Sequence, residues 1–515
     1  MIVALSSTAG TAAGAAAPVC ATCHPKETAR YLKSAMGTSL TPPAPLPAGR
    51  ITHSGPDAIL TTEQRNGRMV HGITEQGLTA EYPIRYQIGG GLMGRTYMVQ
   101  RGDYLFESPV SWYNSSGWDL SPGYGHGLLI DFDRPMEEQC LFCHAGPTQF
   151  VDPDRRRLKN PQLTSITCER CHGESEAHVR HPSAKNILNP AKMGGPVRDS
   201  ICEQCHLEGA NRTLNPGKNW SDFRPGEPAE NTFATYILKG GSSASVRAVS
   251  QVEQLAQSKC VRATAGKLWC GTCHNPHGEV ANRQHEILAI CTSCHVTLSA
   301  AAHPAGQAEC TSCHMPRKPT TDIAHAALTD HRILRRPAGG DKAAEGEPVK
   351  VTAWREPPSN VQDRDLGVAE VVIGFAQRLQ AVGDDGVRLL EAMPAERRRE
   401  DFAVVSDFEG FALEEQDFEQ AAELGRRAVE LAPQSARAAM NLGIVLNKSG
   451  DTTEAERELN RAIDLDPSLK QAYMELATLY SSHQRLQEAT ETVARYLRWN
   501  PRDIMFRLQK ARLLR

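Results

Sequence analysis

The last third of the chain carries small and apolar residues at helical spacing, separated by charged side chains. Alanine, leucine, glutamate and arginine dominate this stretch, and it contains no cysteine. The residues that recur at a step of 34 positions are prolines and alanines: Pro433, Pro467, Pro501, Ala421, Ala455 and Ala489. A fixed period, with small residues where helices touch and a proline after each second helix, predicts an array of paired helices.

This period is typical of tetratricopeptide repeats. Leu442-Gly443 matches Leu476-Ala477, and Phe408 holds the equivalent position one repeat earlier. We predict a C-terminal all-α solenoid over residues 366–515, with repeats at about 400–433, 434–467 and 468–501 and a capping helix over 502–515. Two roles remain open for it: a groove that docks a partner protein, or a helical module that only packs on the rest of the chain.

The preceding sequence has other patterns. Residues 50–125 hold short β-branched and aromatic segments between turn residues, which predicts a small β-rich insertion. The rest of residues 20–334 is expected to be mostly α with little regular structure. Residues 335–365 are rich in proline, glycine and charge and predict a linker. Residues 1–19 have a short apolar start followed by small residues, which fits a signal-peptide remnant or a plain leader.

Charge excludes some functions. The net charge of −3 over 515 residues gives no reason to expect nucleic acid as a partner, and no apolar run of about 18 residues predicts a membrane span. Residues 1–340 hold 33 Lys and Arg against 29 Asp and Glu, whereas residues 341–515 hold 24 against 31. The chain therefore divides into a slightly basic part and an acidic part, along the same boundary as the patterns above.

Cysteine spacing changes this picture most. Fourteen of the 15 cysteines lie in seven CxxCH motifs. These motifs are Cys20-Cys23-His24, Cys140-Cys143-His144, Cys168-Cys171-His172, Cys202-Cys205-His206, Cys270-Cys273-His274, Cys291-Cys294-His295 and Cys310-Cys313-His314. Zinc sites also use CxxC pairs, but zinc does not require a histidine directly after every second cysteine. The pattern predicts seven covalently attached haem c groups, numbered here 1 to 7 in motif order.

The chemistry accounts for the spacing. Two thiols on one short turn can each form a thioether with a haem vinyl group, and the next histidine can reach the iron as its proximal ligand. A histidine on the opposite face makes a saturated electron carrier, whereas an open face can bind a small molecule. Of the 18 histidines, seven are proximal, which leaves eleven for the distal positions.

The segments ITCERCHGESEAH, LWCGTCHNPHG and CTSCHMPRKPTTDIAHAALTDHRI carry a family resemblance. They resemble multihaem c-type cytochromes related to cytochrome c554, pentahaem nitrite reductase and hydroxylamine oxidoreductase, and in particular extracytoplasmic members with C-terminal tetratricopeptide repeats. The resemblance implies that His178 is a distal ligand. It nominates His277 as well, which lies too close to His274 to reach the opposite face of the same haem and should serve a neighbouring one.

The other expected distal ligands are His53, His126, His303, His325 and His331. Met36 stands where related cytochromes often place a histidine, so it either ligates haem 1 or packs against the porphyrin while His53, or else His71, supplies the nitrogen. His181 is a poorer candidate. If His71 does not ligate haem 1, we expect it to lie on the surface or against a haem propionate, as we also expect for His285. We expect His483 to lie on the surface. Cys260, the one cysteine outside the motifs, could be a reactive thiol or an intermolecular partner, but we expect a small buried residue beside haem 5.

These features predict an electron carrier more than an enzyme, with no catalytic residue assigned. The nitrite reductases of this lineage use a CxxCK motif, which the chain lacks. The alternative is a reductase of nitrite, hydroxylamine or a similar small molecule at one five-coordinate haem, with haem 1 or haem 2 as the candidate. A scaffold with structural haems is a third possibility. Haem attachment favours export to the periplasm or beyond, and we expect redox partner proteins, a partner at the repeats and possible self-association.

Overall fold

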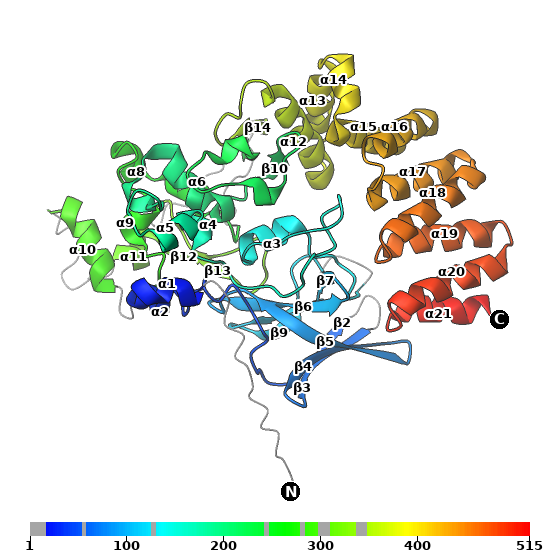
Figure 1. Ribbon diagram of the computed structural model, residues 1–515, viewed down its shortest axis with the longest axis horizontal. Helices are drawn as coiled ribbons and strands as arrows, with labels where there is room; N and C mark the ends of the chain where they lie inside the picture. The colour runs from blue at the N-terminus through cyan, green and yellow to red at the C-terminus, as the bar shows by residue number, and fades with distance from the viewer. Residues whose placement is uncertain are drawn as a thin grey trace, which may run out of the picture.

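The computed structural model describes residues 17–53, 58–124, 130–240, 247–278, 284–296, 310–335 and 348–514. Short helices that carry the CxxCH motifs lie on one side, an antiparallel sheet lies below them, and a curved array of helix pairs forms the other side (Figure 1). No helix within these ranges is both long and apolar enough to cross a membrane.

The sheet is built from strands that follow the first motif. Its members are β1 (Leu40–Thr41), β2 (Gly49–His53), β3 (Ala58–Arg65), β4 (Arg68–Glu75), β5 (Leu78–Ile88), β6 (Gly94–Arg101), β7 (Tyr104–Glu107), β8 (Val110–Tyr113) and β9 (Gly117–Leu120). Hydrogen bonds follow the order β2-β3-β4-β5-β6-β8-β9, while β1 pairs with β5 and β7 with β6. Along β3, buried and half-buried residues alternate, as expected for a strand with one face in a core.

The two ends of this path approach each other. Trp118 Nε1 on β9 donates a hydrogen bond to the Pro47 carbonyl beside β2 at 2.7 Å, and a Cβ on Gly49 would come within 2.2 Å of the Trp118 ring. The seven strands of the path therefore form a near-closed antiparallel barrel. The predicted β-rich insertion is present over nearly the expected residues: its strands run from Leu40 to Leu120, against the predicted 50–125, and they form one regular sheet.

His71 lies inside this barrel, with no exposed surface. Its Nδ1 contacts Ser108 Oγ at 2.8 Å, and its ring meets the rings of Tyr97 and Trp118 edge-on. Burial lowers the pKa of His71 to about 3, so the imidazole is neutral. The expectation of a surface or propionate-contacting His71 is therefore wrong, because the barrel encloses the side chain.

The helices outside the barrel and the array are short. They are α1 (Ala17–Cys23), α2 (Pro25–Tyr31), α3 (Glu138–His144), α4 (Glu169–His172), α5 (Glu176–Arg180), α6 (Gly195–His206), α7 (Gln251–Gln257), α8 (Lys259–Ala263), α9 (Cys270–Cys273), α10 (Gln284–Cys294) and α11 (Cys310–His314), with 3-10 turns at Pro190–Lys192, Trp220–Asp222 and Ala229–Asn231. Apart from α6 and α10, none of these helices exceeds seven residues, so each of the others has at most about two turns.

Two small sheets complete this part of the chain. Strands β10 (Asn211–Leu214), β11 (Phe233–Lys239) and β14 (Lys350–Ala353) form one, and β12 (Arg317–Pro319) pairs with β13 (Ala327–Thr329) in the other. Strand β14 lies within the range predicted as linker and pairs with β11 from Tyr236 to Lys239. This pairing joins the start of the helical array to the motif-bearing part of the chain.

The C-terminal array consists of stacked helix pairs. Its helices are α12 (Gln362–Gln377), α13 (Gln380–Glu391), α14 (Ala395–Glu400), α15 (Phe402–Glu414), α16 (Phe418–Leu431), α17 (Ala436–Ser449), α18 (Thr452–Leu465), α19 (Lys470–Ser482), α20 (Leu486–Trp499) and α21 (Ile504–Leu513). The repeated alanines 421, 455 and 489 are fully buried, because neighbouring helices approach closely there. The predicted all-α solenoid is confirmed. His483, at the end of α19, is exposed as predicted.

Glu409 on α15 is buried between these helices. It is 2% exposed, and its Oε1 has no hydrogen-bond partner among the described residues. Burial raises the pKa of Glu409 from 4.5 to about 8. Below pH 4.5 the carboxyl is protonated in both the folded and the unfolded chain, whereas between pH 4.5 and 8 only the unfolded chain ionises, so stability is lost as the pH rises.

Glu409→Gln should therefore raise the free energy of unfolding by about 2–4 kcal/mol at pH 8 and change it little at pH 4. Denaturant titration of the full chain, followed by circular dichroism, measures this difference. Glu419→Gln, on the exposed face of α16, is the matched control and should have no such pH dependence. Equal effects of Glu409→Gln at the two pH values would contradict the assignment.

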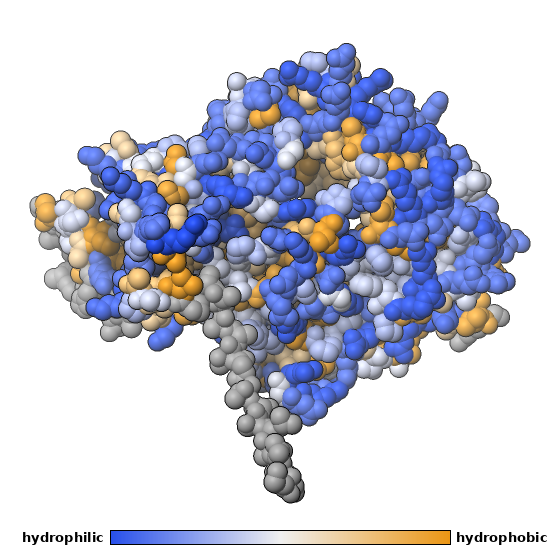
Figure 2. Space-filling view, in the orientation of Figure 1, coloured by the Kyte–Doolittle hydropathy of each residue, from blue (hydrophilic) through white to orange (hydrophobic). Residues whose placement is uncertain are grey.

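One edge of the array packs on the rest of the chain. Arg156 Nη1 lies 2.7 Å from Asp466 Oδ2, and Ser435 Oγ donates to Asp154 Oδ1 at 2.5 Å. Ile504 of α21 belongs to the apolar cluster of the barrel. In the space-filling view the outer surface of the array is mainly hydrophilic (Figure 2). One edge of the array therefore packs against the rest of the chain. Such intramolecular packing is one of the two roles that the sequence left open.

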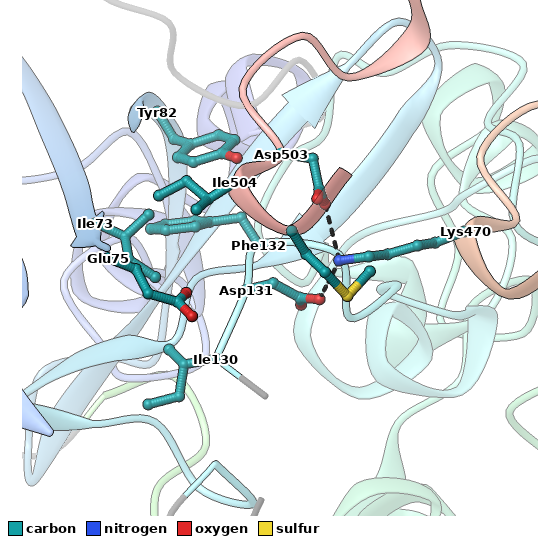
Figure 3. A pocket seen from close by; sticks show the side chains of 10 residues that line it. Ile73, Glu75, Tyr82, Ile130, Asp131, Phe132, Lys470, Asp503 and Ile504 are labelled. Carbon is teal, nitrogen blue, oxygen red and sulfur yellow. Dashed lines mark hydrogen bonds and ion pairs between the residues drawn. The ribbon is translucent and has the colours of Figure 1, made fainter. Parts of the chain in front are cut away.

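A small pocket marks this junction. Lys470 Nζ lies 2.7 Å from Asp131 Oδ2 and 2.8 Å from Asp503 Oδ2 (Figure 3). Its distance to Asp133 Oδ2 is 3.1 Å, and Asp133 also pairs with Arg101. The three carboxylates raise the pKa of Lys470 well above its ordinary value, against the opposing effect of burial. The junction is therefore a buried, charged cluster contributed by the array and by the segment that leads from the barrel to the second motif.

Candidate haem-binding site

The seven motifs occupy helices α1, α3, α4, α6, α9, α10 and α11, each ending at or next to its histidine. In every motif the short helix brings the two thiols to one turn, because positions i and i+3 are neighbours on a helix. The fourteen cysteines are at least partly accessible, and Cys23, Cys294 and Cys313 are exposed. The local structure therefore matches what covalent attachment of a haem requires.

Thiols of different motifs lie next to each other. An interaction between the thiols of Cys143 and Cys205 lowers the pKa of Cys143 and raises that of Cys205. A corresponding interaction raises the pKa of Cys202 and lowers that of Cys270. These contacts join the second motif to the fourth and the fourth to the fifth.

Two further thiol contacts extend the pattern. Burial, together with the neighbouring Cys20 thiol, raises the pKa of Cys168 to about 12. Burial, together with the neighbouring Cys310 thiol, raises the pKa of Cys291 to about 11, with smaller contributions from Cys273 and Cys260. The first motif thus adjoins the third, and the sixth adjoins the seventh. Cys260 on α8 is half-buried and lies near Cys291 of the sixth motif.

Three histidine pairs bring a motif histidine opposite a predicted distal ligand. The ring centroids of His24 and His178 are 6.4 Å apart, with planes 18° from parallel. For His172 and His277 these values are 5.8 Å and 13°, and for His274 and His331 they are 6.1 Å and 23°. Metal–imidazole bonds of about 2 Å on both sides of one ion place the ring centroids roughly 6 Å apart. The three pairs therefore fit an iron held between two imidazoles.

Hydrogen bonds set the tautomer of several rings. The Nδ1 atoms of His172 and His331 lie 2.8 Å from the carbonyls of Leu188 and Thr329, respectively. The Nδ1 atom of His178 lies 3.0 Å from the Ser183 carbonyl. Because a carbonyl only accepts hydrogen bonds, Nδ1 of His172 and His331 carries the proton and Nε2 carries the lone pair that a metal needs. His178 has the same tautomer, since its carbonyl contact is shorter than the 3.4 Å contact of the Ser183 N–H with Nδ1. This arrangement is the usual one for metal-binding histidines.

Burial keeps two further motif histidines neutral. Burial lowers the pKa of His144 to about 4, with a smaller effect of His206, and lowers the pKa of His206, with smaller effects of His274 and His331. His206 ends α6, whose last carbonyls accept hydrogen bonds from the Arg212 guanidinium, including those of Glu203 and Gln204 at 2.9 and 2.8 Å. Arg212 thereby fixes the end of the helix that carries the fourth motif.

His325, another predicted ligand, lies against strand β9. His325 Nε2 is 2.6 Å from Asp119 Oδ2 of β9, and its ring meets Tyr113 edge-on. If His325 ligates iron, Nδ1 is the available nitrogen. His53 ends β2 in the barrel. His126 and His303 lie outside the described residues. Met36 is partly buried in the turns that follow α2.

Some residues that matter here carry no recognisable motif. Asn186 and Leu188 contact His178 and His172 from a loop to whose residues the sequence assigned no role. Asp119 and Arg212 were not identified either. Asn186 lies in a polar loop eight residues after a predicted ligand, and this position is the one signal that could have indicated it. Asp119 contacts His325 across 206 residues, and no local pattern in the sequence indicates that contact.

Short CxxCH helices with paired histidines, joined to stacked helix pairs, define a c-type cytochrome fused to helical repeats. Comparison with known families agrees: residues 129–173 match the family described as cytochrome c554 and c-prime, and residues 412–468 and 446–513 match the tetratricopeptide repeat. The chain thus contains a cytochrome c554/c-prime segment, which implies covalently bound haem c, and C-terminal tetratricopeptide repeats.

Three individual relatives each match a limited share of the chain. A protein SGT1 homolog of Oryza sativa subsp. japonica is 40% identical over 75 residues, which are 14% of this chain and 20% of that protein. The chain therefore spans a fifth of the length of this curated relative. The Arabidopsis OM64 tetratricopeptide domain is 20% identical and covers 22% of this chain and 96% of its own, with a TM-score of 0.21. The second tetratricopeptide domain of human RPAP3, solved with an HSP70 peptide, is 22% identical and covers 22% and 92%, with a TM-score of 0.20.

Proposed function

We propose that the chain is a seven-haem cytochrome c that transfers electrons along a contiguous row of haems. The fourteen motif cysteines would attach the haems, and His24, His144, His172, His206, His274, His295 and His314 would be the proximal ligands. The observation that carries the proposal is the set of three parallel histidine pairs, each joining a motif histidine to a histidine from another part of the chain.

These pairs assign three distal ligands. His178 would serve haem 1, His277 haem 3 and His331 haem 5. For haem 1 this favours His178 over Met36 and His53. His53, His126, His303 and His325 stay predicted ligands for the other haems. Two imidazoles saturate an iron, so these residues hold sites that exchange electrons without binding a substrate.

The thiol contacts support an order for the row. The thiol interactions support neighbouring positions for haems 1 and 3, haems 2 and 4, haems 4 and 5, and haems 6 and 7. Weaker interactions of Cys202 with Cys171 and of Cys291 with Cys273 link haem 4 to haem 3 and haem 6 to haem 5. The resulting order is 1-3-4-5-6-7, with haem 2 beside haem 4.

When bound, the haems would supply reversible one-electron chemistry, and the residues around them would tune their reduction potentials. Carbonyl acceptors at Nδ1 orient the imidazoles and make them more basic, and burial of His144 and His206 lowers the local polarity. Exposed Cys23 at one end of the row and exposed Cys294 and Cys313 at the other would let redox partner proteins approach both ends. Haem attachment at CxxCH supports a periplasmic or extracellular location.

The repeats would contribute in two ways. One edge of the array holds the segments on both sides of the second motif, through the contacts of Lys470 with Asp131 and of Asp466 with Arg156. The remaining surface of the repeats is available for a protein partner or for a second copy of the chain, as expected of tetratricopeptide arrays. Partner docking thus remains part of the proposal, beside the intramolecular packing.

Intact-mass measurement of the denatured protein tests the haem count. We expect a mass increase equal to seven haem groups that survives denaturation, because each haem is held by two thioethers. Loss of one haem group in a Cys291→Ala/Cys294→Ala variant, against none in Cys260→Ala, would assign the sixth motif. An unmodified mass, or haem released on denaturation, would overturn the proposal.

A further inference from the structure

A six-residue loop between α5 and the following 3-10 turn contacts two of the paired histidines. Its residues 183–188 have the sequence SAKNIL. The Ser183 carbonyl accepts from His178 Nδ1 at 3.0 Å, and the Leu188 carbonyl accepts from His172 Nδ1 at 2.8 Å. One short loop therefore holds the rings assigned to the distal face of haem 1 and the proximal face of haem 3.

Asn186 fixes this loop onto α5. Its Nδ2 donates to the carbonyls of Ala177 at 3.2 Å and His181 at 2.8 Å. Because an amide nitrogen only donates, these two bonds orient the side chain so that Oδ1 faces His178 Nδ1, at 3.1 Å. Asn186 is half-buried, whereas the residues from His181 to Lys185 are exposed. The amide thus bridges the last turn of α5, the loop and the imidazole.

This position has a chemical consequence. An acceptor at Nδ1 holds the imidazole plane and draws its proton, which makes Nε2 a better electron donor to a metal. A more basic axial ligand stabilises the ferric over the ferrous state and lowers the reduction potential. Without the amide, the Ser183 carbonyl would be the remaining acceptor, on a loop that had lost its two bonds to α5.

We propose that Asn186 is the positioning residue for His178: it keeps this imidazole on the distal face of haem 1 and lowers the potential of that haem. The inference rests on the proposed haem ligation by His24 and His178. It extends that proposal, because Asn186 is neither a proposed iron ligand nor a motif cysteine. It also predicts that the first haem responds to a change in a loop shared with the third.

The test compares Asn186→Leu with Asn114→Leu in the haem-loaded full chain. Asn114 is a matched control, because its Nδ2 also donates to two carbonyls, those of Gly91 and Leu92 at 2.7 and 3.2 Å, in a turn of the barrel that holds no motif. Carbon monoxide binding to the reduced protein reports a detached distal ligand. His178→Ala gives the reference spectrum for a haem 1 open to carbon monoxide.

Asn186→Leu should weaken His178 binding about 10-fold or more, which would appear as carbon monoxide binding at one haem with the spectrum of His178→Ala and as a higher midpoint potential for one haem. Asn114→Leu should behave as the unchanged protein. Asn186→Asp keeps an acceptor oxygen but loses the two bonds that Nδ2 donates to α5, so it should also weaken His178 binding. Haem content by mass, measured on every variant, excludes misassembly as the cause.

The outcomes separate the two proposals. If the unchanged protein lacks a covalent haem at the first motif, the haem ligation is wrong and the inference falls with it. If all seven haems are present and Asn186→Leu shows neither carbon monoxide binding nor a shifted midpoint, only the role of Asn186 is overturned. An equal response to Asn114→Leu would also overturn it, because the effect would then not be specific to His178.

Discussion

Replacing His331 with alanine is expected to convert one low-spin haem of the seven into a high-spin haem that binds carbon monoxide. His331 stands opposite His274 at a centroid distance of 6.1 Å, and its Nδ1 proton is held by the Thr329 carbonyl. Without this ring the iron loses its sixth ligand, so its spin state and reactivity change. The midpoint potential of that haem should also rise, because a basic axial ligand is lost.

Magnetic circular dichroism and carbon monoxide titration measure this change. His483→Ala is the matched control, because His483 lies at an exposed helix end of the array and should leave all seven haems low-spin. Mass measurement should show an unchanged number of haems in both variants, since no cysteine is altered. Seven low-spin haems in His331→Ala would exclude His331 as a ligand.

Lys470→Met should destabilise the chain by about 3–5 kcal/mol, the cost of leaving buried charges without their partner. Lys470 Nζ is within 3.1 Å of oxygens from Asp131, Asp133 and Asp503. With methionine there, Arg101 would be the remaining cation that pairs with this cluster in the described structure. We therefore expect the junction between the array and the barrel to open at lower denaturant concentration.

Denaturant titration followed by tryptophan fluorescence measures the loss, because Trp499 lies against Tyr104 at this junction. Lys448→Met, at an exposed position of α17, is the control and should change stability by less than about 0.5 kcal/mol. In an Asp503→Asn background the cost of Lys470→Met should fall, since the two residues interact directly. Equal costs in both backgrounds would show that Lys470 and Asp503 are not coupled, and a cost of Lys470→Met no larger than that of Lys448→Met would contradict a stabilising role for the cluster.

The sequence predicted the array best, because its signal is local and periodic. Pro433, Pro467 and Pro501 repeat a unit whose helices pack on their neighbours in the chain, so the period alone fixes the architecture. The barrel was predicted only as β-rich segments. Its closure depends on the meeting of β2 with β9, and contacts such as Trp118 to Pro47 across 71 residues leave no local pattern.

In the candidate site too, local features could be predicted from the sequence and long-range contacts could not. The seven motifs are readable because both thioether cysteines and the proximal histidine must lie on one turn. His178, His277 and His331 could be nominated from motifs close to them, and the structure places each opposite a histidine of another motif. The contact of His325 with Asp119 and those of Lys470 with Asp131 and Asp133 span more than 200 residues, and nothing in the nearby sequence indicates them.

A redox titration followed by electron paramagnetic resonance tests the central claim most directly. It counts the ferric haems, separates low-spin from high-spin iron and shows whether neighbouring haems influence each other. The account predicts seven haems per chain that are reduced reversibly, with low-spin signals and with spin coupling between adjoining haems such as 1 and 3. Haems that titrate independently, or a high-spin haem whose signal changes on addition of nitrite or hydroxylamine, would contradict an electron-transferring row and favour a reductase.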